Sequence, residues 1–383
     1  MSVERILKVN FPNKLVFGNG VLGQLAEDVV GLGSQSIILM TIEPLVQQLE
    51  PFITHLRNEG VQVTIDTSII QEPSFTDLKR VLATYQGMAI DTVIGIGGGS
   101  VLDIAKLVAA QLDNTQTVEE IVGNGLLHRR NIGLICAPAT AGTGSEVSPN
   151  AILVDDENQK KGIISPFLVP DAVYVDPLLT VGLPAGITAA TGLDALTHCL
   201  EAYTNKFAQP FIDMYAFEGM RLIAANLVEA VHNGTNTQAR QEVAMGSMLG
   251  GFCLGPVNTA AVHALSYPLG SMFHLAHGLS NALLLPYVME YNYVAAPKKY
   301  AEVAIALGCE RRSTDEETAR AGIVKVKELI KDCGIPARLR DVNIPKEAIP
   351  QMAEDAMKIT RLLVNNPREI SLSDALSIFN AAY

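Results

Sequence analysis

The sequence predicts a two-domain protein in which an α/β domain, with a parallel sheet and helices on both faces, is followed by an all-α domain. Two observations support this fold class. Over roughly the first 180 residues, short β-rich apolar runs alternate with helix-like runs, as in chains of βαβ units. Beyond Pro184 that alternation stops and helix-forming residues dominate. We therefore expect domains at 1–180 and 181–383.

The strands expected in the first domain are short and mostly apolar, which is typical of strands buried on both faces of a sheet. They lie at residues 36–40, 61–66, 91–95, 132–136 and 171–176. Helix-like patterns between them cover residues 21–30, 44–58, 75–86 and 101–111. In the second domain, helix-like runs cover residues 188–203, 218–232, 239–251, 297–307, 314–333 and 346–364. Every expected strand therefore belongs to the first domain.

The composition excludes several classes of protein. The 383 residues include 28 basic and 40 acidic side chains, for a net charge of −12, and an acidic chain does not suit nucleic acid or an anionic membrane surface. The five cysteines are scattered and form no CxxC pair, which indicates a reducing compartment and a cytoplasmic location. The N-terminal residues lack the apolar core of a secretory signal.

One long segment carries no charge. The 47 residues from 243 to 289 contain no Asp, Glu, Lys or Arg, yet they hold three of the seven histidines, His263, His274 and His277. Glycines and prolines interrupt the segment, so it contains no run of about 20 apolar residues that could span a bilayer. We expect this segment to be buried in the protein, and histidines buried there require partners.

Two glycine-rich segments follow expected strands. Residues 18–23 (GNGVLG) match the G-x-G-x-x-G pattern, with Glu43 as a possible ribose ligand. This short pattern is more often a plain strand-turn-helix, which we favour here. Residues 97–100 (GGGS) are the better phosphate site, because three glycines let a phosphate approach the backbone and Ser100 can cap the helix that follows. The hydroxyl-rich segment 139–146 could bind a ribose or a second phosphate, or simply pack closely.

A set of carboxylate and imidazole side chains suggests a metal site. Asp194 and His198 are four residues apart, so they share one face of the expected helix. Such a pair alone is more often a surface hydrogen bond, but His263 and His277 in the uncharged segment complete a set of one Asp and three His. That set suits Fe(II) or Zn(II). His274 could share a helix face with His277 as a ligand, a supporting donor or a proton carrier.

Four motifs together resemble the iron-containing (group III) metal-dependent alcohol dehydrogenases. They are GIGGGSVLDIAK at 95–106, PATAGTGSEVS at 138–148, GLDALTHCLEAY at 192–203, and the run from HALSYPLG at 263 to HGLSNALLLPYVM ending at 289. The similarity extends from VFGNG at 16–20 to NNPREIS at 365–371. It implies the dehydroquinate synthase-like fold of that family, with an NAD(P)-binding N-terminal domain and a helical domain that binds the metal and the substrate.

The resemblance also implies roles for individual residues. The family's metal ligands match Asp194, His198, His263 and His277. Its cofactor-binding positions match Gly97, Gly98, Gly99, Ser100, Asp103, Thr140, Thr143, Ser145, Asn150, Lys161 and Leu183. Residues 18–23 are a family feature too, but they are not the phosphate loop in that family.

The chain departs from the family pattern at two positions. Ile42 stands where many members have an Asp that binds the adenosine ribose and favours NAD. Without that carboxylate NADP becomes admissible, but no Lys or Arg nearby invites it and Glu43 could serve NAD, so the choice between the two stays open. Tyr267 stands where one branch has a His near the substrate. Tyr267 or His274 could replace that His in a proton relay.

The predicted function is hydride transfer between nicotinamide C4 and a small alcohol or aldehyde whose oxygen binds Fe2+ or Zn2+. The alternatives are a dehydroquinate synthase-like lyase that uses a metal and NAD, a non-redox metal hydrolase, and a binding module without catalysis. The lyase would need a basic cluster that segment 243–289 lacks, and the hydrolase leaves the 97–100 loop unused. The resemblance further implies a homodimer or larger homo-oligomer, in which residues 4–11 could pair as an edge strand.

Overall fold

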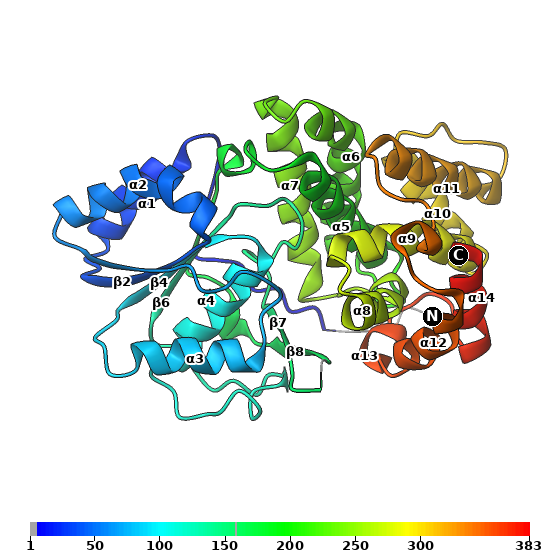
Figure 1. Cartoon of the computed structure of the whole chain (residues 1–383). Coiled ribbons are helices and arrows are strands. Elements are labelled where there is room, and N and C mark those ends of the chain that lie inside the picture. The colour runs from blue at the N-terminus through cyan, green and yellow to red at the C-terminus, as the bar shows by residue number, and fades with distance from the viewer. Residues whose placement is uncertain (1–5, 158) are drawn as a thin grey trace. The chain divides into compact units, whose positions relative to one another are not determined.

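The structure is a computed structural model that describes residues 6–157 and 159–383. It divides into two compact units, which Figure 1 shows as a sheet-containing part and a helical part. The α/β unit comprises Asn10–Thr140 and Gly144–Thr180. The helical unit comprises Val181–Tyr383 together with Ala141–Thr143 and residues 6–9, because Leu7, Val9 and Ala141 pack against the core of the helices. The predicted fold class, a parallel α/β domain followed by an all-helical domain, is confirmed.

The α/β unit is built on a six-stranded sheet in which every pairing is parallel. Its strands, in spatial order, are β1 (Lys14–Phe17), β9 (Ala172–Val175), β6 (Gly133–Pro138), β4 (Thr92–Gly97), β2 (Ser36–Met40) and β3 (Gln62–Asp66). Residues 6–11 form no strand, and Glu4 and Arg5 of the expected edge strand lie outside the described residues. Strand β1 lies at one edge of this sheet.

Helices cover both faces of this sheet, as predicted. Successive residues of β2 point to opposite faces, so Ile38 and Met40 pack with α3 (Phe75–Tyr85) and α4 (Gly99–Gln111). Ile37 and Leu39 pack with the helices α1 (Val21–Gly31) and α2 (Glu43–Asn58) on the other face. Figure 1 shows these two helix pairs on opposite sides of the strands.

A second, smaller sheet was not predicted from the sequence. It consists of β5 (Gly123–Asn124), β8 (Lys160–Ile164) and β7 (Asn150–Val154), with β7 and β8 antiparallel. Strand β5 has only two residues, and β8 begins with two lysines, so neither shows the apolar run by which buried strands are recognised. Strand β7 begins at Asn150, one of the expected cofactor contacts.

The helical unit contains ten α-helices among the described residues. They are α5 (Ala185–Thr204), α6 (Pro210–His232), α7 (Thr237–Leu254), α8 (Ala261–Phe273), α9 (His277–Asn292), α10 (Pro297–Ala306), α11 (Asp315–Asp332), α12 (Ile349–Met357), α13 (Thr360–Leu363) and α14 (Leu372–Ala382). The helix expected at 346–364 is broken into α12 and α13, with a short 3-10 turn before them. The helices α5, α7, α10 and α11 are found within a few residues of their expected ends, and α6 begins earlier than expected, at Pro210. No range was predicted for α8, α9 or α14.

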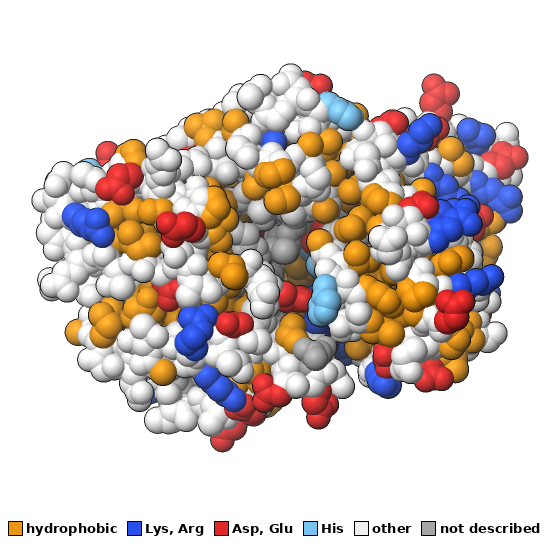
Figure 2. All heavy atoms as spheres, viewed as in Figure 1, with side chains coloured by type: hydrophobic (Ala, Val, Ile, Leu, Met, Phe, Trp, Pro, Cys, Tyr) orange, Lys and Arg blue, Asp and Glu red, His pale blue; other side chains and the backbone are white. Residues whose placement is uncertain are grey.

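The uncharged segment 243–289 forms most of α7, all of α8 and most of α9, and its side chains are mostly buried. No described helix combines the length and the apolar character needed to cross a membrane. On the face drawn in Figure 2, Lys and Arg side chains gather over α10 and α11 with Asp and Glu side chains among them. Residues of α11 form ion pairs that include Arg311–Asp315 and Lys327–Glu290.

One glycine sets the distance between the two helices that matter most for the site. A Cβ atom on Gly278, the second residue of α9, would lie 2.1 Å from the carbonyl oxygen of Ala190 in α5 and 3.2 Å from Cβ of Asp194. Only glycine permits this approach without moving a helix. The contact places the first turn of α9, and with it His277, directly against the turn of α5 that carries Asp194.

Candidate metal centre

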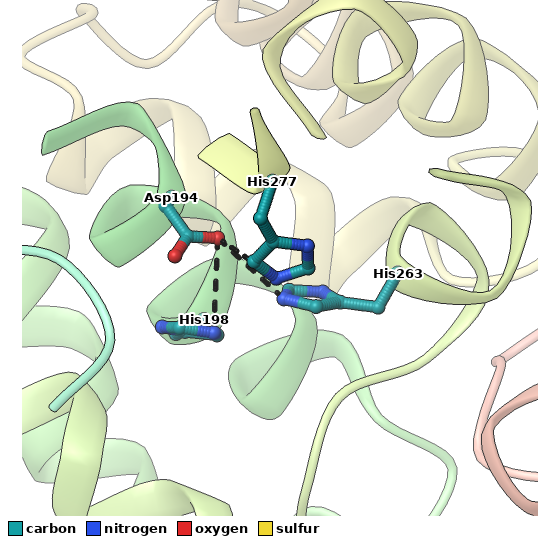
Figure 3. Close-up of side chains that lie close together, drawn as sticks. All are labelled: Asp194, His198, His263 and His277. Carbon is teal, nitrogen blue, oxygen red and sulfur yellow. Dashed lines mark ion pairs between the residues drawn. The ribbon is translucent and has the colours of Figure 1, made fainter. Parts of the chain in front are cut away.

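Four side chains from three helices converge on one point in the helical unit. Asp194 and His198 lie on successive turns of α5, His263 lies in the first turn of α8, and His277 begins α9. Their nearest ligand atoms all lie within 4.8 Å of one another. Asp194 Oδ1 stands 3.8 Å from Nε2 of His198, 3.7 Å from that of His263 and 3.6 Å from that of His277, as the dashed lines in Figure 3 show.

Access to these atoms is uneven. The side chains of Asp194, His198 and His263 are at most 6% exposed, whereas that of His277 is 30% exposed. The rings of His198 and His263 are stacked, with centroids 4.8 Å apart, and the ring of His277 is tilted against His263 at 5.1 Å. Solvent therefore reaches the cluster on the side of His277.

The charges of the cluster are strongly coupled. Burial alone would raise the pKa of Asp194, but the imidazoles of His198, His277 and His263 outweigh it and hold that pKa well below its usual range. Burial lowers the pKa of His198. Burial would also lower the pKa of His263, but its contacts with Asp194 and Glu201 raise it to about 9. A buried carboxylate is thus kept anionic and attracts positive charge to this point.

Glu201 orients one of the ligands, although its role was not predicted from the sequence. This buried carboxylate accepts hydrogen bonds from the backbone N–H groups of Ala260 and Val262, at 2.9 and 2.6 Å, and from Nδ1 of His263 at 2.6 Å. A proton held on Nδ1 leaves the lone pair of His263 Nε2 free to bind a cation. The available signal was position: Glu201 is three residues after His198 on the same helix.

The donor set fits a divalent cation. Ligand atoms bonded to one ion at about 2.0–2.2 Å stand roughly 3–4 Å apart, which is the range measured from Asp194 Oδ1 to the three imidazoles. One carboxylate oxygen and three imidazole nitrogens, without a thiolate, suit Fe2+ or Zn2+. A carboxylate behind a ligating imidazole is the usual second contact of such sites. The four residues predicted from the sequence are therefore brought together as a metal site.

The two residues proposed for proton transfer differ in their placement. Tyr267 lies one turn after His263 on α8, its ring centroid is 6.2 Å from that of His277, and its hydroxyl accepts a hydrogen bond from Nη2 of Arg361 at 3.0 Å. His274 is exposed and caps the C-terminus of α8 in the left-handed conformation, at φ 54°. The expectation that His274 shares a helix face with His277 is wrong, because the chain leaves α8 before α9 begins.

The glycine loop lies where a parallel sheet binds phosphates. Gly97 ends β4, Gly98 is the N-cap of α4, and Gly99 and Ser100 begin that helix. Ser100 is not the cap, contrary to expectation, because the helix begins one residue before it. Gly98 has no side chain with which to cap this end, and the open N–H groups of a helix N-terminus are a common anion-binding site. A Cβ on Gly98 would stand 3.5 Å from Thr140, in the loop after the neighbouring strand β6.

Three of the expected cofactor residues are joined by a buried lysine whose role was not predicted from the sequence. Lys106 Nζ donates to Ser145 Oγ at 2.9 Å and to the carbonyl oxygen of Asn150 at 2.7 Å. Asp103 accepts from Ser145 Oγ at 2.5 Å and from the backbone N–H of Ile152 at 2.9 Å. Burial raises the pKa of Asp103 and lowers that of Lys106. Asp103 and Ser145 therefore help to fasten the segment from Ser145 to Ile152 to α4.

The remaining residues expected to contact the cofactor are not joined in one network. Asn150 has a buried side-chain oxygen that no described residue hydrogen-bonds. Lys161 is held by Asp155 and Gln159, at 3.1 and 3.0 Å, and pairs across the hairpin with Leu153. Thr140, Thr143 and Leu183 are partly buried in loops. The structure thus leaves Asn150 with an unsatisfied oxygen and gives Lys161 partners of its own.

The G-x-G-x-x-G segment at 18–23 has an internal anion instead of a phosphate. Asp176 accepts hydrogen bonds from the backbone N–H groups of Gly20 and Leu22, at 3.0 and 3.3 Å, at the N-terminus of α1. This arrangement agrees with the strand-turn-helix interpretation. At the end of β2, Ile42 is the N-cap of α2 and Glu43 is its first residue. The neighbouring Thr41 has a buried hydroxyl without a partner among the described residues.

Comparisons with known proteins agree with this site. Residues 12–177 match the family described as iron-containing alcohol dehydrogenase, and residues 188–383 match the Fe-containing alcohol dehydrogenase family, C-terminal. The chain is 38% identical over 389 residues to long-chain-alcohol dehydrogenase 1 of Geobacillus thermodenitrificans, covering 100% of this chain and 98% of the relative. It is also similar to the crystal structure of a 1,3-propanediol oxidoreductase, with a TM-score of 0.95 and 33% identity over 99% and 100% of the two chains. A third match is sulfoacetaldehyde reductase from Bifidobacterium kashiwanohense in complex with NAD+, with a TM-score of 0.89 and 26% identity over 99% of each chain.

Proposed function

The chain belongs to the iron-containing alcohol dehydrogenase family, and from that membership we propose that it is an NAD-dependent enzyme that uses Fe2+ to interconvert small alcohols and aldehydes. The enzyme class is that of a metal-dependent alcohol dehydrogenase or aldehyde reductase. The observation that carries the proposal is the convergence of Asp194, His198, His263 and His277 within 4.8 Å. Iron is preferred over zinc on the family description alone, because both ions suit these ligands.

The chemistry divides between the bound groups and the protein. When bound, the metal supplies a Lewis acid for the substrate oxygen, and the nicotinamide supplies the hydride acceptor or donor. The protein places two buried carboxylates, the ligand Asp194 and the supporting residue Glu201, beside the imidazole ligands. The partly exposed side of His277 is where we place the substrate.

Tyr267 is our proposed proton carrier in place of the family's His. It lies beside His277, and the Arg361 donor on its hydroxyl oxygen leaves the phenolic proton available for transfer. Tyr267→Phe should lower the rate of aldehyde reduction while leaving metal content unchanged. A rate equal to that of the wild type would overturn this role for Tyr267.

For the cofactor we propose that Gly97, Gly98, Gly99 and Ser100 bind the pyrophosphate at the N-terminus of α4. Asp103, Thr140, Thr143, Ser145, Asn150, Lys161 and Leu183 would surround the ribose and nicotinamide, with Asp103 and Ser145 acting through the Lys106 network. NAD is supported by the NAD+ complex of the sulfoacetaldehyde reductase relative. The negative charge of Glu43, next to Ile42, would repel the 2′-phosphate of NADP.

The substrate is proposed from the relatives and stays at the level of a class. The relatives are named for a long-chain alcohol, 1,3-propanediol and sulfoacetaldehyde, so we propose an alcohol or an aldehyde as the substrate class. We also propose a homodimer in the cytoplasm. The exposed edge strand β1 offers a surface for pairing, and the five cysteines, all of which are described, are free thiols as expected in a reducing compartment.

The deciding experiment uses metal-stripped protein reloaded with Fe2+ or Zn2+. Oxidation of NADH and of NADPH is followed with a panel of aldehydes, and His277→Ala serves as the metal-site control. We expect reduction of at least one aldehyde, a preference for NADH, and loss of both bound metal and activity in the variant. Wild-type metal content and activity in His277→Ala would overturn the site, and inactivity with every aldehyde would favour the lyase or hydrolase alternative.

Gly98 offers a test of the cofactor loop that spares the fold. A Cβ there makes only ordinary contact with Thr140, whereas one on Gly97 would come within 2.8 Å of Val101. Gly98→Ala should weaken NADH binding by about tenfold or more, because the methyl group occupies the side from which a phosphate approaches. Metal binding should be unaffected. Equal NADH affinity in the variant and the wild type would place the pyrophosphate elsewhere.

A further inference from the structure

A carboxamide that is not among the four ligands lies against three of them. Asn281 is fully buried and stands one turn after His277 on α9. Its Nδ2 is 2.7 Å from Asp194 Oδ1, 3.1 Å from His263 Nε2 and 3.3 Å from His277 Nε2. Each of these three atoms is a ligand atom of the proposed metal site. The amide nitrogen of Asn281 therefore lies beside the point at which the ligands converge.

Only one of the three contacts can persist when a metal is bound. An imidazole nitrogen that binds a cation has no lone pair left for a hydrogen bond, so Nε2 of His263 and of His277 cease to be acceptors. A carboxylate oxygen has a second lone pair and can accept a hydrogen bond while it binds a cation. Asp194 Oδ1 is thus the lasting partner of Asn281.

The rest of the amide shows that packing alone does not explain an Asn here. Its Oδ1 is buried and has no hydrogen-bond partner among the described residues. A buried polar atom without a partner destabilises the fold, and an apolar side chain of similar volume would avoid that cost. Asn281 therefore makes the core less stable than an apolar side chain would, so its N–H donor has to serve a purpose other than packing.

We propose that Asn281 is a positioning residue of the metal site: its N–H group holds Asp194 so that Oδ1 alone faces the three imidazoles. The inference rests on the proposed function, because it assumes that the cluster binds a metal. Without this hydrogen bond the carboxylate is free to turn about its Cβ–Cγ bond and to bind through both oxygens. The hydrogen bond therefore sets both the affinity of the site and the number of oxygens that Asp194 contributes.

The test compares Asn281→Leu and Asn281→Ser with wild type in the full chain. Co2+ and Zn2+ dissociation constants are measured by chelator competition, and the visible spectrum of the Co2+ form reports the coordination geometry. Loss of an outer-sphere partner typically costs about 10–100-fold in metal affinity, and we expect that loss in both variants together with a changed Co2+ spectrum. Activity is not needed for either measurement.

Asn292 provides the matched control. It lies on the same helix, is equally buried, and exchanges hydrogen bonds of 2.8 and 2.7 Å with Asn366 away from the cluster. Asn292→Leu should lower the melting temperature without changing the Co2+ affinity or spectrum. A loss of metal affinity in Asn292→Leu as large as in the Asn281 variants would reduce the role of Asn281 to packing and overturn the proposal.

The outcomes separate this inference from the proposed function. If His277→Ala loses the metal but folded Asn281→Leu and Asn281→Ser bind Co2+ within twofold of wild type, only the role of Asn281 is overturned. If wild type and His277→Ala bind Co2+ equally, the metal site itself fails. Should both Asn281 variants fail to fold, a crystal structure of the zinc-loaded wild type decides, because a distance from Asn281 to Asp194 Oδ1 beyond hydrogen-bond range contradicts the proposal.

Discussion

At the scale of single residues, the metal site depends on side chains that act through the ligands. A neutral imidazole offers one nitrogen to a metal only when the other nitrogen holds the proton. Glu201 enforces that state on His263, since its carboxylate is fixed by two backbone N–H groups and cannot turn away. The same carboxylate raises the pKa of His263. Glu201 therefore increases the basicity of the ligand as well as its order.

Replacing Glu201 by Gln tests this dependence. The amide keeps the shape of the side chain but removes its charge, so His263 becomes a weaker ligand and Nδ1 loses its strongest acceptor. We expect metal affinity to fall by about 10–100-fold, measured by chelator competition, with little change in the circular dichroism of the helices. Glu302→Gln serves as the control, because Glu302 also accepts a hydrogen bond, from the hydroxyl of Tyr203, but is more exposed than Glu201. Equal affinities in Glu201→Gln and wild type would contradict the assigned role.

A second residue-scale prediction concerns Asp171 in the α/β unit. Its carboxylate accepts two hydrogen bonds from Arg130, at 2.7 and 2.9 Å, and one from the backbone N–H of Leu134 at 2.8 Å. Burial would raise the pKa of Asp171, but these donors outweigh it and lower the pKa. The folded-state pKa thus lies below the unfolded value of about 3.9. The ionised carboxylate stabilises the fold above that pH, and this contribution is lost as the pH falls through the folded-state value.

Asp171→Asn should therefore lower the free energy of unfolding by about 1–2 kcal/mol near neutral pH, the range for hydrogen bonds to a charged group after allowance for the partial exposure of Asp171. The difference from wild type should shrink below about pH 4. Urea unfolding at several pH values measures both effects. A constant difference down to the lowest pH would mean that the loss arises from the neutral hydrogen bonds and not from the charge.

At the scale of secondary-structure elements, the site depends on how closely α5 and α9 approach. The first turn of α9 contacts the backbone of α5 at Ala190, four residues before Asp194. Gly278 therefore couples helix packing to ligand geometry. A side chain there has to push His277 away from Asp194 or shift the whole helix.

Gly278→Ala should lower stability by at least about 1–3 kcal/mol, the usual cost of overpacking, and should weaken metal binding in the protein that still folds. Gly186→Ala is the matched control on α5, because a Cβ there meets nothing within 4 Å. That substitution should change stability by between zero and about 1 kcal/mol in the favourable direction, through helix propensity. Thermal unfolding with and without added Zn2+ measures both variants. If Gly278→Ala binds Zn2+ as tightly as the control, the close approach does not set the ligand geometry.

The same scale explains what the sequence could and could not reveal. The strands of the large sheet and most helices were predictable, because burial on both faces of a parallel sheet requires unbroken apolar runs. The β7–β8 hairpin was missed since Lys160 and Lys161 open its second strand. The prediction that Ser100 caps α4 is wrong because the N-cap is Gly98, which has no side chain by which a cap can be recognised. The prediction that His274 shares a helix with His277 is wrong because nothing in the sequence marks the left-handed residue that ends α8.

At the scale of the whole molecule, the site residues were predictable by type and spacing, whereas their supports were not. The four ligands were assigned from one Asp and three His in distinctive motifs, which the comparison with a family makes specific. Glu201, Asn281 and Lys106 are ordinary helix residues in the sequence. Their roles depend on which side chains from distant parts of the chain pack against them, and that is tertiary information.

All four ligands belong to the helical unit, so metal removal should destabilise that unit first. Binding to the folded state alone stabilises it by about 2.7 kcal/mol when the free metal is at 100 times its dissociation constant. Without the metal, the carboxylate of Asp194 stays buried beside imidazoles that compete for protons. We expect a chelator to lower the melting temperature of the wild type and to leave that of His277→Ala unchanged. Hydrogen exchange should locate the loss of protection in α5, α8 and α9, with β2 and β4 unaffected; equal loss in the sheet would show that the metal stabilises the chain as a single cooperative unit.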